Sequence, residues 1–189
     1  SPLLPDEYYN VRRLASVEDR LYISTPQGMI ILNTAALEKQ VLNEQIVKKQ
    51  IPVLLSIPMG ESSDAMQKQV TGSHSFFNIC ENNKPIVDLF TPDKARTSWT
   101  KHTLTAKDLG FASIELHDRF VLLDSINSLL IIHDHYVYLY NISSKQITTL
   151  TKTDITIPDG ISVIHNKLYI CGRNTIYTKP LLYELDLES

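Results

Sequence analysis

Short polar and apolar stretches alternate along most of this chain, and four of these stretches begin in the same way. Each has an apolar residue, a polar pair ending in Asp or Asn, a basic residue or His, and then a strand-forming run; the four segments are residues 17–24, 116–123, 132–139 and 164–171. Asp and Asn tolerate left-handed backbone angles and hydrogen-bond to their own chain, which suits the tip of a tight hairpin. The pattern therefore predicts a hairpin tip at each of these places.

The predicted tips recur at regular distances. Asp118 and Asn166 are 48 residues apart, and Asp19 and Asp118 are 99 residues apart, about two such steps. A period in this range is typical of stacked β-sheet units such as propeller blades. The second copy is expected near residue 69, and its closest candidate is residues 75–90.

Strand-forming runs separated by polar turns predict an all-β fold, a β-propeller-like array of antiparallel sheets with about four blades. Residues 136–140 alternate Tyr with aliphatic residues, as in a strand buried on both faces. In the clearest unit, strands are expected at residues 111–116, 120–123, 128–132, 136–142 and 146–150. We expect a single domain or partial propeller over residues 1–189, with units at residues 11–57, 73–106, 110–151 and 158–189.

Three longer segments connect the predicted strands. Residues 34–51 fit either a helix with Thr34 as its cap or a pair of strands, and a parallel with residues 140–147 slightly favours strands. Residues 60–72 are polar and predict a surface loop. Residues 91–103 predict a second loop, which carries the only Trp of the chain, Trp99.

Several of these segments resemble known propeller repeats. Residues 20–33 resemble the strand–turn–Gly–strand repeat of bacterial sensor propellers, and residues 136–141 resemble the closing strands of a WD40 blade. Residues 158–161 (Pro-Asp-Gly-Ile) and 166–170 (Asn-Lys-Leu-Tyr-Ile) resemble repeats of NHL and calcium-dependent lactonase propellers. The chain thus resembles the general architecture of WD40, kelch and NHL-like repeats, and it lacks the Trp-Asp and double-Gly signatures that would select one family.

The resemblance implies that the chain is either a four-bladed ring or part of a larger one. Most propellers have more than four blades, which favours a partial ring that is completed by further blades. A partial ring leaves open sheet edges, and such edges need a partner segment. The expected partner is therefore another protein or the remainder of the chain's own propeller.

Composition and charge narrow the range of partners. The net charge is −3 and the pI is about 6.0, so electrostatics gives no reason to expect a nucleic acid or an anionic membrane surface. The longest apolar candidate, residues 128–140, is interrupted by polar residues and falls short of the roughly 18 residues of a membrane span. The first seven residues have no signal-peptide pattern, which slightly favours a cytoplasmic location.

The His-rich segments suggest a metal site as an alternative. His133 and His135 stand at i and i+2, so in a strand they would share a face and could ligate zinc, with His117 or a carboxylate nearby. The favoured interpretation is that these residues occupy turn positions, because Glu18-Asp19 and His165-Asn166 fill the same slot elsewhere. We therefore expect no cofactor.

Catalytic motifs are weak in this sequence. A calcium-dependent lactonase would need a group of carboxylates and an Asn around a central ion, and the candidates are Glu115, Asp118, Asp159 and Asn166. No recurring acidic position supports that group, and the sequence has no Gly-x-Ser-x-Gly motif and no Gly-rich phosphate loop. A non-catalytic role is therefore favoured over an enzyme.

Four residues in predicted loops or rims are the candidate binding residues. Trp and Arg are enriched at interface hot spots, so Trp99 and Arg96 are expected to contact a partner, although a single Trp also commonly ties a loop to the core. Arg173 and Tyr177 complete the set. The favoured function is a protein–protein interaction or scaffold module; the alternatives are a metal-dependent ligand-binding or hydrolytic propeller and a structural half-domain that completes a ring with another chain.

Overall fold

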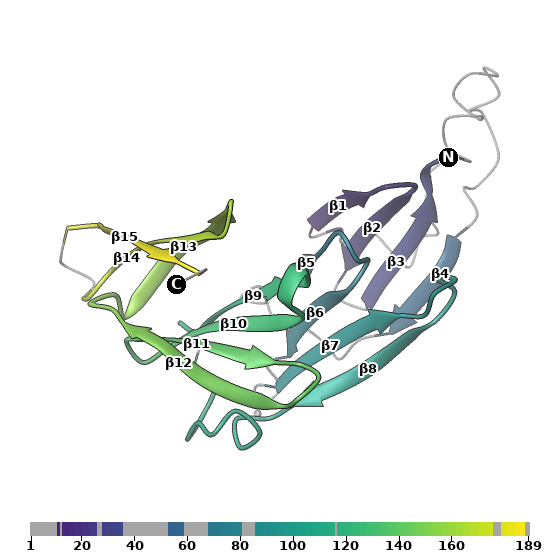
Figure 1. The fold of residues 1–189 in the computed structure, drawn as a ribbon. Coiled ribbons are helices and arrows are strands. Elements are labelled where there is room, and N and C mark those ends of the chain that lie inside the picture. Colours follow the sequence, from purple (N-terminus) through teal and green to yellow (C-terminus); the bar gives the residue numbers. More distant parts are fainter. Residues whose placement is uncertain are drawn as a thin grey trace. The chain divides into compact units, whose positions relative to one another are not determined.

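The structure is a computed structural model, and it describes residues 11, 13–25, 28–35, 53–58, 68–80, 86–115, 117–175 and 179–187. The described residues form four antiparallel sheets (Figure 1). The first sheet contains β1 (Arg13–Val17), β2 (Arg20–Thr25), β3 (Gly28–Asn33) and β4 (Val53–Pro58). The second contains β5 (Lys68–Val70), β6 (Phe76–Cys80), β7 (Ile86–Pro92) and β8 (Trp99–Leu104).

The remaining strands form two further sheets of the same kind. The third sheet contains β9 (Arg119–Leu123), β10 (Ser128–His133), β11 (Tyr136–Asn141) and β12 (Gln146–Lys152). The fourth contains β13 (Ile157–Ile164), β14 (Lys167–Arg173) and β15 (Leu181–Asp186). In every sheet the order of the strands in space follows their order along the chain. Repetition of such meandering antiparallel sheets is the pattern of propeller blades, so the predicted all-β, propeller-like fold class is confirmed.

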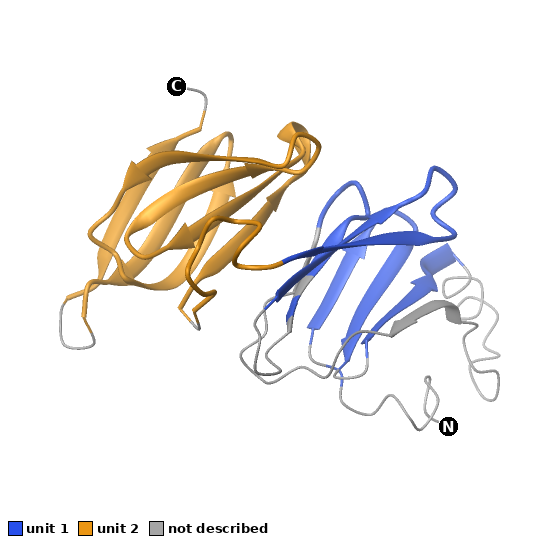
Figure 2. Ribbon diagram, turned by 90° about the horizontal axis from the view of Figure 1, so that it is seen from below, with its two compact units in different colours: residues 1–104 blue, residues 105–189 orange. Residues whose placement is uncertain are grey.

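The chain divides into two compact units, Ser1–Leu104 (unit 1) and Thr105–Ser189 (unit 2), which are coloured separately in Figure 2. Each unit holds two sheets, and within each unit the first strands of the two sheets contact each other, β1 with β5 and β9 with β13. The predicted single domain and its four unit boundaries remain a prediction.

A separate hydrophobic core joins the two sheets of each unit. In unit 1 it is built from buried residues of four strands, namely Tyr22, Met29, Ile31, Phe76 and Phe90. In unit 2 it is built from buried aliphatic residues, namely Val121, Leu123, Leu130, Ile132, Val137, Ile155, Leu168 and Ile170. Strands that alternate apolar with polar residues place one face on such a core, and removal of that apolar area from water is the main source of stability.

Three of the four predicted hairpin tips are confirmed. They join β1 to β2, β10 to β11 and β13 to β14. Their residues adopt the left-handed backbone angles expected of tips, with φ of 50° at Glu18, 42° at Asp134 and 61° at Asn166. The backbone preference of Asp, Asn and similar polar residues thus located these turns correctly.

The fourth tip and the strand expected before it are wrong. Residues 111–115 form no strand, and the segment enters β9 from irregular backbone. The Asp118 carboxylate accepts a hydrogen bond from the Glu115 backbone N–H at 2.7 Å, and the Asp118 N–H donates to the Glu115 carbonyl at 3.1 Å. These local bonds close a turn and compete with sheet pairing.

The loop expected at residues 91–103 is shorter than predicted. β7 extends to Pro92 and β8 begins at Trp99, so only residues 93–98 form the turn. Asp93 holds this turn closed by accepting hydrogen bonds from the backbone and side chains of Thr97 and Ser98. Part of the loop expected at residues 60–72 is the strand β5. Of residues 34–51, which carry the helix-or-strand alternative, residues 36–51 lie outside the described residues.

Within the described residues, no helix has both the length and the apolar character needed to cross a membrane.

Candidate interaction site

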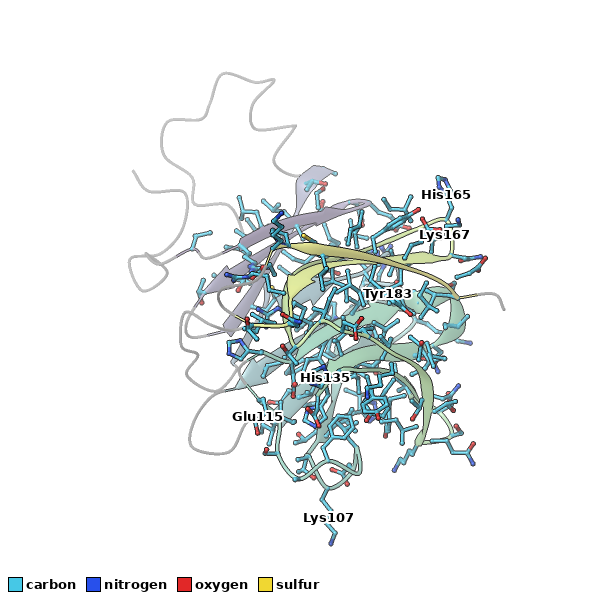
Figure 3. All side chains as sticks on the ribbon, turned by 90° about the vertical axis from the view of Figure 1, so that its left-hand side faces the viewer. Lys107, Glu115, His135, His165, Lys167 and Tyr183 are labelled. Carbon is cyan, nitrogen blue, oxygen red and sulfur yellow. The ribbon has the colours of Figure 1, made fainter. Side chains whose placement is uncertain are left out.

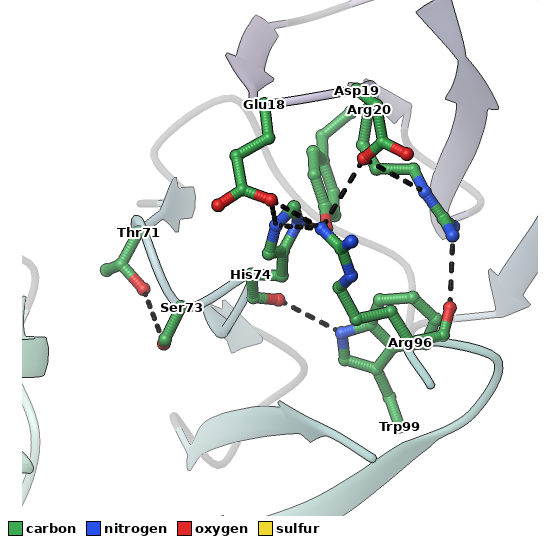
Figure 4. Close-up of polar contacts among 9 residues, drawn as sticks. Glu18, Asp19, Arg20, Thr71, Ser73, His74, Arg96 and Trp99 are labelled. Atoms are coloured by element: carbon green, nitrogen blue, oxygen red, sulfur yellow. Dashed lines mark hydrogen bonds and ion pairs between the residues drawn. The ribbon is translucent and has the colours of Figure 1, made fainter. Parts of the chain in front are cut away.

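Three turns of unit 1 bring a group of charged side chains together. The β1–β2 turn supplies Glu18 and Asp19, the β5–β6 turn supplies His74, and the β7–β8 turn supplies Arg96; we call these four residues the turn cluster (Figure 4). Arg96 Nη1 donates to Glu18 Oε2 at 2.7 Å and lies 3.4 Å from Asp19 Oδ1. The cluster therefore joins turns from both sheets of the unit.

His74 forms the buried floor of the cluster. The residue is only 3% exposed, and its ring lies between Tyr22 and Arg96. Nε2 lies 2.6 Å from Arg96 Nη1 and 3.3 Å from Glu18 Oε2. Nδ1 lies 2.6 Å from the Tyr22 hydroxyl oxygen. Burial raises the pKa of Tyr22 to about 12, so Tyr22 is a neutral anchor and not a nucleophile.

Three members of the cluster have left-handed backbone angles although none is glycine. The φ angles are 50° at Glu18, 64° at His74 and 56° at Arg96. This conformation costs roughly 1–2 kcal/mol for an ordinary residue. Side-chain bonds between the turns offset the cost, and residues held in this way are concentrated at binding and catalytic sites.

The rim of the cluster faces solvent, in contrast to its floor. The side chains of Glu18 and Asp19 are 64% and 46% exposed, whereas that of Arg96 is 30% exposed. Arg20 supports the rim from below: its Nη1 donates to the Arg96 carbonyl at 3.4 Å, and its Nε lies 3.7 Å from Asp19 Oδ1. The site therefore offers two carboxylates and one guanidinium on a braced backbone.

Trp99 connects the cluster to the hydrophobic core. Its indole Nε1 donates to the His74 carbonyl oxygen at 3.1 Å, and its ring packs against Phe76 with centroids 6.4 Å apart. The side chain is partly buried, which matches the expected role of tying a segment to the core. Only the exposed part of the Trp99 side chain is available for the predicted contact with a partner.

The pKa of Glu18 gives a testable signature of the cluster. Hydrogen bonds with His74 and Arg96 hold this pKa below its ordinary value of 4.5. The folded state thus binds its proton more weakly than the unfolded state does. The stability from Glu18 is then fully present above pH 4.5 and is lost as the pH falls through the lowered folded-state pKa.

Glu18→Gln is therefore expected to lower the melting temperature near neutral pH, and the difference from the wild type should narrow as the pH falls from about 6 to about 3. Thermal unfolding followed by Trp99 fluorescence measures this difference. Asp154→Asn, at an exposed carboxyl outside the cluster, is the control. A wild-type advantage that stays constant across this pH range would contradict the assigned ion pairs.

The other two predicted binding residues do not join this site. Arg173, at the end of β14 in unit 2, makes a two-pronged contact with Asp159, its Nε and Nη2 each donating to one carboxylate oxygen at 3.1 Å. Tyr177 lies outside the described residues. The structure therefore brings together Arg96 and Trp99, while Arg173 is paired within its own sheet.

Sequence reasoning missed His74 and treated Glu18 and Asp19 only as a turn. The available signal was the polar run Thr71-Gly72-Ser73-His74 directly before a strand. That run predicts a turn, as found, but it does not reveal which other turns lie beside it. The partners Glu18 and Arg96 are 78 positions apart along the chain.

The His residues of the metal alternative are not arranged as ligands of one ion. His133 ends β10, its Nδ1 lies 2.9 Å from each oxygen of the buried Asp118, and its ring stacks on Phe111 at 4.1 Å. His135 (labelled in Figure 3) lies in the following turn with φ of 68° and so does not share a strand face with His133. His117 is exposed. Across the described ranges, no group of three or more His, Cys, Asp or Glu side chains could hold a metal ion.

The candidate carboxylates of a lactonase site are also engaged separately. Asp118 bonds to His133, Asp159 bonds to Arg173, and Glu115 accepts a hydrogen bond from the Ser113 hydroxyl. Burial raises the pKa of Asp118 above its ordinary value of 3.8, partly offset by the bonds from the Glu115 backbone and His133. This pair ties the segment before β9 to the end of β10, which is a structural role.

Comparison with known proteins supports the fold and goes no further. No family model matches the sequence, and no curated protein matches it. The extracellular domain of a putative one-component system from B. thetaiotaomicron is 14% identical with a TM-score of 0.59, over 95% of this chain and 23% of that one. A functionally unknown protein from Desulfotomaculum acetoxidans is 12% identical with a TM-score of 0.51, over 96% of this chain and 56% of that one.

The WD40 domain of SCAP from fission yeast is a further neighbour, 10% identical with a TM-score of 0.49, over 90% of this chain and 43% of that one. The chain thus spans between about a quarter and somewhat over half of the length of these structures. Likeness at such low identity shows a shared fold alone. Together with the repeated antiparallel sheets, the first two of these likenesses show that the chain has a propeller-like, all-β architecture without assignment to a specific family.

Proposed function

We propose that this chain is a non-catalytic protein-interaction module, and that the turn cluster is its contact surface in unit 1. The observation that carries this proposal is the convergence of three turns on an exposed pair of carboxylates and Arg96, above the buried His74. Strained turns braced in this way present charged groups in a fixed geometry, which lowers the entropic cost of binding a partner. The acidic side chains and Arg96 suit a partner surface that carries both signs of charge.

The contacts within the described residues also support a non-catalytic role. The buried groups that could act as an acid or a base bond to neighbouring residues: His74 to Tyr22 and Arg96, Asp88 to Thr103, and Asp118 to His133. Trp99 and Arg96 are the residues whose substitution should affect partner binding most.

Arg96→Ala is expected to weaken partner binding at least about tenfold, because truncation of an interfacial Arg commonly costs that much. Tagged wild-type and variant proteins are compared by quantitative affinity capture from the source cells. The amounts of the proteins recovered with the wild type should all decrease by a similar factor with the variant. Trp99→Phe, which keeps the aromatic packing and removes the indole N–H, tests the second residue without emptying the core.

Lys101→Ala removes one exposed positive charge from β8 in the same unit and serves as the matched control. Thermal melts of all variants show whether the fold is intact. Equal recovery of the same proteins by folded Arg96→Ala and by the wild type would overturn the proposed surface.

A second function, a structural segment that completes a ring with another chain, is favoured by one observation. The fourth sheet has three strands in the described residues, whereas each of the other three has four.

A further inference from the structure

The Nε2 atom of His74 lies within reach of both a cation and an anion. It is 2.6 Å from Arg96 Nη1 and 3.3 Å from Glu18 Oε2 (Figure 4). A guanidinium only donates hydrogen bonds, and an ionised carboxylate only accepts them. Nε2 must present a lone pair to bond with Arg96 and a hydrogen to bond with Glu18. It can therefore form only one of these two bonds at a time.

The other ring nitrogen keeps its partner in both cases. Nδ1 lies 2.6 Å from the Tyr22 hydroxyl oxygen. Burial raises the pKa of Tyr22 to about 12, so this hydroxyl keeps its hydrogen and can accept a bond from Nδ1–H. A neutral ring with its hydrogen on Nδ1 and a protonated ring both donate to Tyr22. These two states of His74 differ only at Nε2, which accepts from Arg96 in the first and donates to Glu18 in the second.

The surrounding charges respond to a proton on this ring in opposite ways. Within the described residues, the charged side chains in and around the cluster are Glu18 and Asp19 of the β1–β2 turn, Arg20 of β2 and Arg96 of the β7–β8 turn. Hydrogen bonds with His74 and Arg96 hold the pKa of Glu18 below 4.5, so Glu18 stays ionised where histidine side chains usually change charge, at about pH 5 to 8. Glu18 therefore attracts a protonated His74, and Arg96 is repelled by it.

Protonated His74 also competes with Arg96 for a single oxygen atom. Both contacts to Glu18 use Oε2, at 3.3 Å from His74 Nε2 and 2.7 Å from Arg96 Nη1. The remaining contact of Nη1, to Asp19 Oδ1 at 3.4 Å, joins partly exposed side chains, and such pairs contribute little in water. A protonated His74 thus removes or weakens each bond that holds the guanidinium.

Arg96 is the member of the cluster that is free to move. His74 is 3% exposed, its N–H donates to the Thr71 carbonyl at 2.9 Å, and its carbonyl accepts from Trp99 Nε1 at 3.1 Å. The Arg96 side chain is 30% exposed, and its bonds to described residues all leave from Nη1. Its backbone is held separately, because the Arg96 N–H donates to the Asp93 carbonyl at 3.1 Å. The side chain can therefore turn outward without opening the turn.

We propose that the turn cluster is a proton-operated switch, in which uptake of one proton by His74 moves its Nε2 bond from Arg96 to Glu18 and turns the Arg96 side chain out to solvent. The neutral ring holds Arg96 against the two carboxylates. The protonated ring engages Glu18 and leaves Arg96 to bind an anionic group of a partner. The effect on a partner rests on the proposed function, whereas the movement of Arg96 is a property of this chain alone.

Nitrogen NMR of the full isotope-labelled chain at about pH 8 and about pH 5 tests the switch without a partner. At the higher pH, His74 Nε2 should give the signal of a ring nitrogen without hydrogen. Arg96 should give separate Nη1 and Nη2 signals, because a held guanidinium does not rotate freely. At the lower pH, both ring nitrogens should carry hydrogen and the Arg96 signals should merge. The indole N–H signal of Trp99, the only Trp, should persist at both pH values.

Three variants separate the switch from general effects of acid. His74→Gln keeps a hydrogen-bonding group that takes up no proton, so the Arg96 signals should be the same at both pH values. Glu18→Gln removes the carboxylate that favours the protonated ring, so protonation of His74 should need a roughly tenfold higher proton concentration. His102→Gln, at an exposed position of β8 in the same unit, is the matched control and should behave as the wild type.

The switch is overturned if Nε2 already carries hydrogen at the higher pH, if His74 takes up no proton at the lower pH, or if the Arg96 signals stay separate once the ring is protonated. Merging of these signals in folded His74→Gln, or protonation at an unchanged pH in Glu18→Gln, would also contradict it. Affinity capture with Arg96→Ala decides the proposed function independently. Reduced capture without a switch would remove only the control by protons, and a switch with unchanged capture would remove only the proposed surface.

Discussion

Phe76→Ala is expected to lower the free energy of unfolding of unit 1 by about 4 kcal/mol, as large truncations of buried aromatic residues do. Phe76 is completely buried at the centre of an aromatic group. Its ring stacks on Phe90 with centroids 4.9 Å apart, meets Tyr22 edge-on at 6.2 Å, and contacts Trp99 at 6.4 Å. Truncation leaves a cavity under Tyr22 and Trp99, the two residues that anchor His74.

Trp99 is the only Trp of the chain, so its fluorescence reports on unit 1 directly. Urea unfolding followed at this signal should show a lower midpoint for Phe76→Ala. Leu14→Ala, on the exposed side of β1, is the control and should change stability by less than about 0.5 kcal/mol. Equal midpoints for Phe76→Ala and Leu14→Ala would show that the aromatic group does not hold the two sheets of unit 1 together.

Gly172→Ala is expected to destabilise the fourth sheet by about 3 kcal/mol, at the upper end of the usual cost of overpacking. A Cβ atom at this position would lie 2.4 Å from the Ile157 carbonyl oxygen, 2.6 Å from Ile155 Cγ2 and 2.9 Å from Pro158 Cα. Two of these atoms belong to the backbone of β13, whose register with β14 shifts between Pro158 and Gly160. β13 can make room only by separating from β14.

Gly160→Ala is a closely matched control, because a Cβ atom at Gly160 meets nothing within 4 Å. Amide hydrogen exchange over residues 157–173 measures the effect. Exchange should accelerate strongly in Gly172→Ala and little in Gly160→Ala. The same protection in both variants would mean that β13 and β14 do not approach as closely at Gly172 as described.

Local backbone chemistry explains which turns were predicted correctly. The tips at Asp134 and Asn166 follow from Asp and Asn, which adopt left-handed angles at low cost, and this preference is independent of distant contacts. Asp118 fits the same pattern but forms no tip between strands, because its carboxylate bonds to the Glu115 backbone and to His133. The same residue type thus forms a hairpin tip at Asp134 and closes a local turn at Asp118.

The repeat was predicted incorrectly in register. The turns before Arg119 and Lys167 were paired as equivalent, yet Arg119 opens the first strand of its sheet and Lys167 opens the second strand. The equivalent elements are the third strands that begin at Gly28, Ile86, Tyr136 and Leu181. The position of a strand in its sheet is defined by the strands to which it is hydrogen-bonded. A short sequence motif does not reveal that position.

The candidate site shows the same division. Arg96 and Trp99 are predicted from residue type and expected exposure. Trp99 lies not in a loop, as expected, but at the first position of β8. Their association with Glu18 and His74 rests on contacts between turns that are 22 to 78 positions apart. No local pattern predicts which turns meet.

The sequence by itself determined the all-β class, the positions of most strands and the left-handed tips, because alternation and backbone preference act over a few neighbouring residues. Tertiary structure alone decided which sheets share a core and how His74 is enclosed by Tyr22 and Arg96. These features depend on burial and pairing between segments far apart in the chain, and such long-range terms leave no signature in a short stretch of sequence.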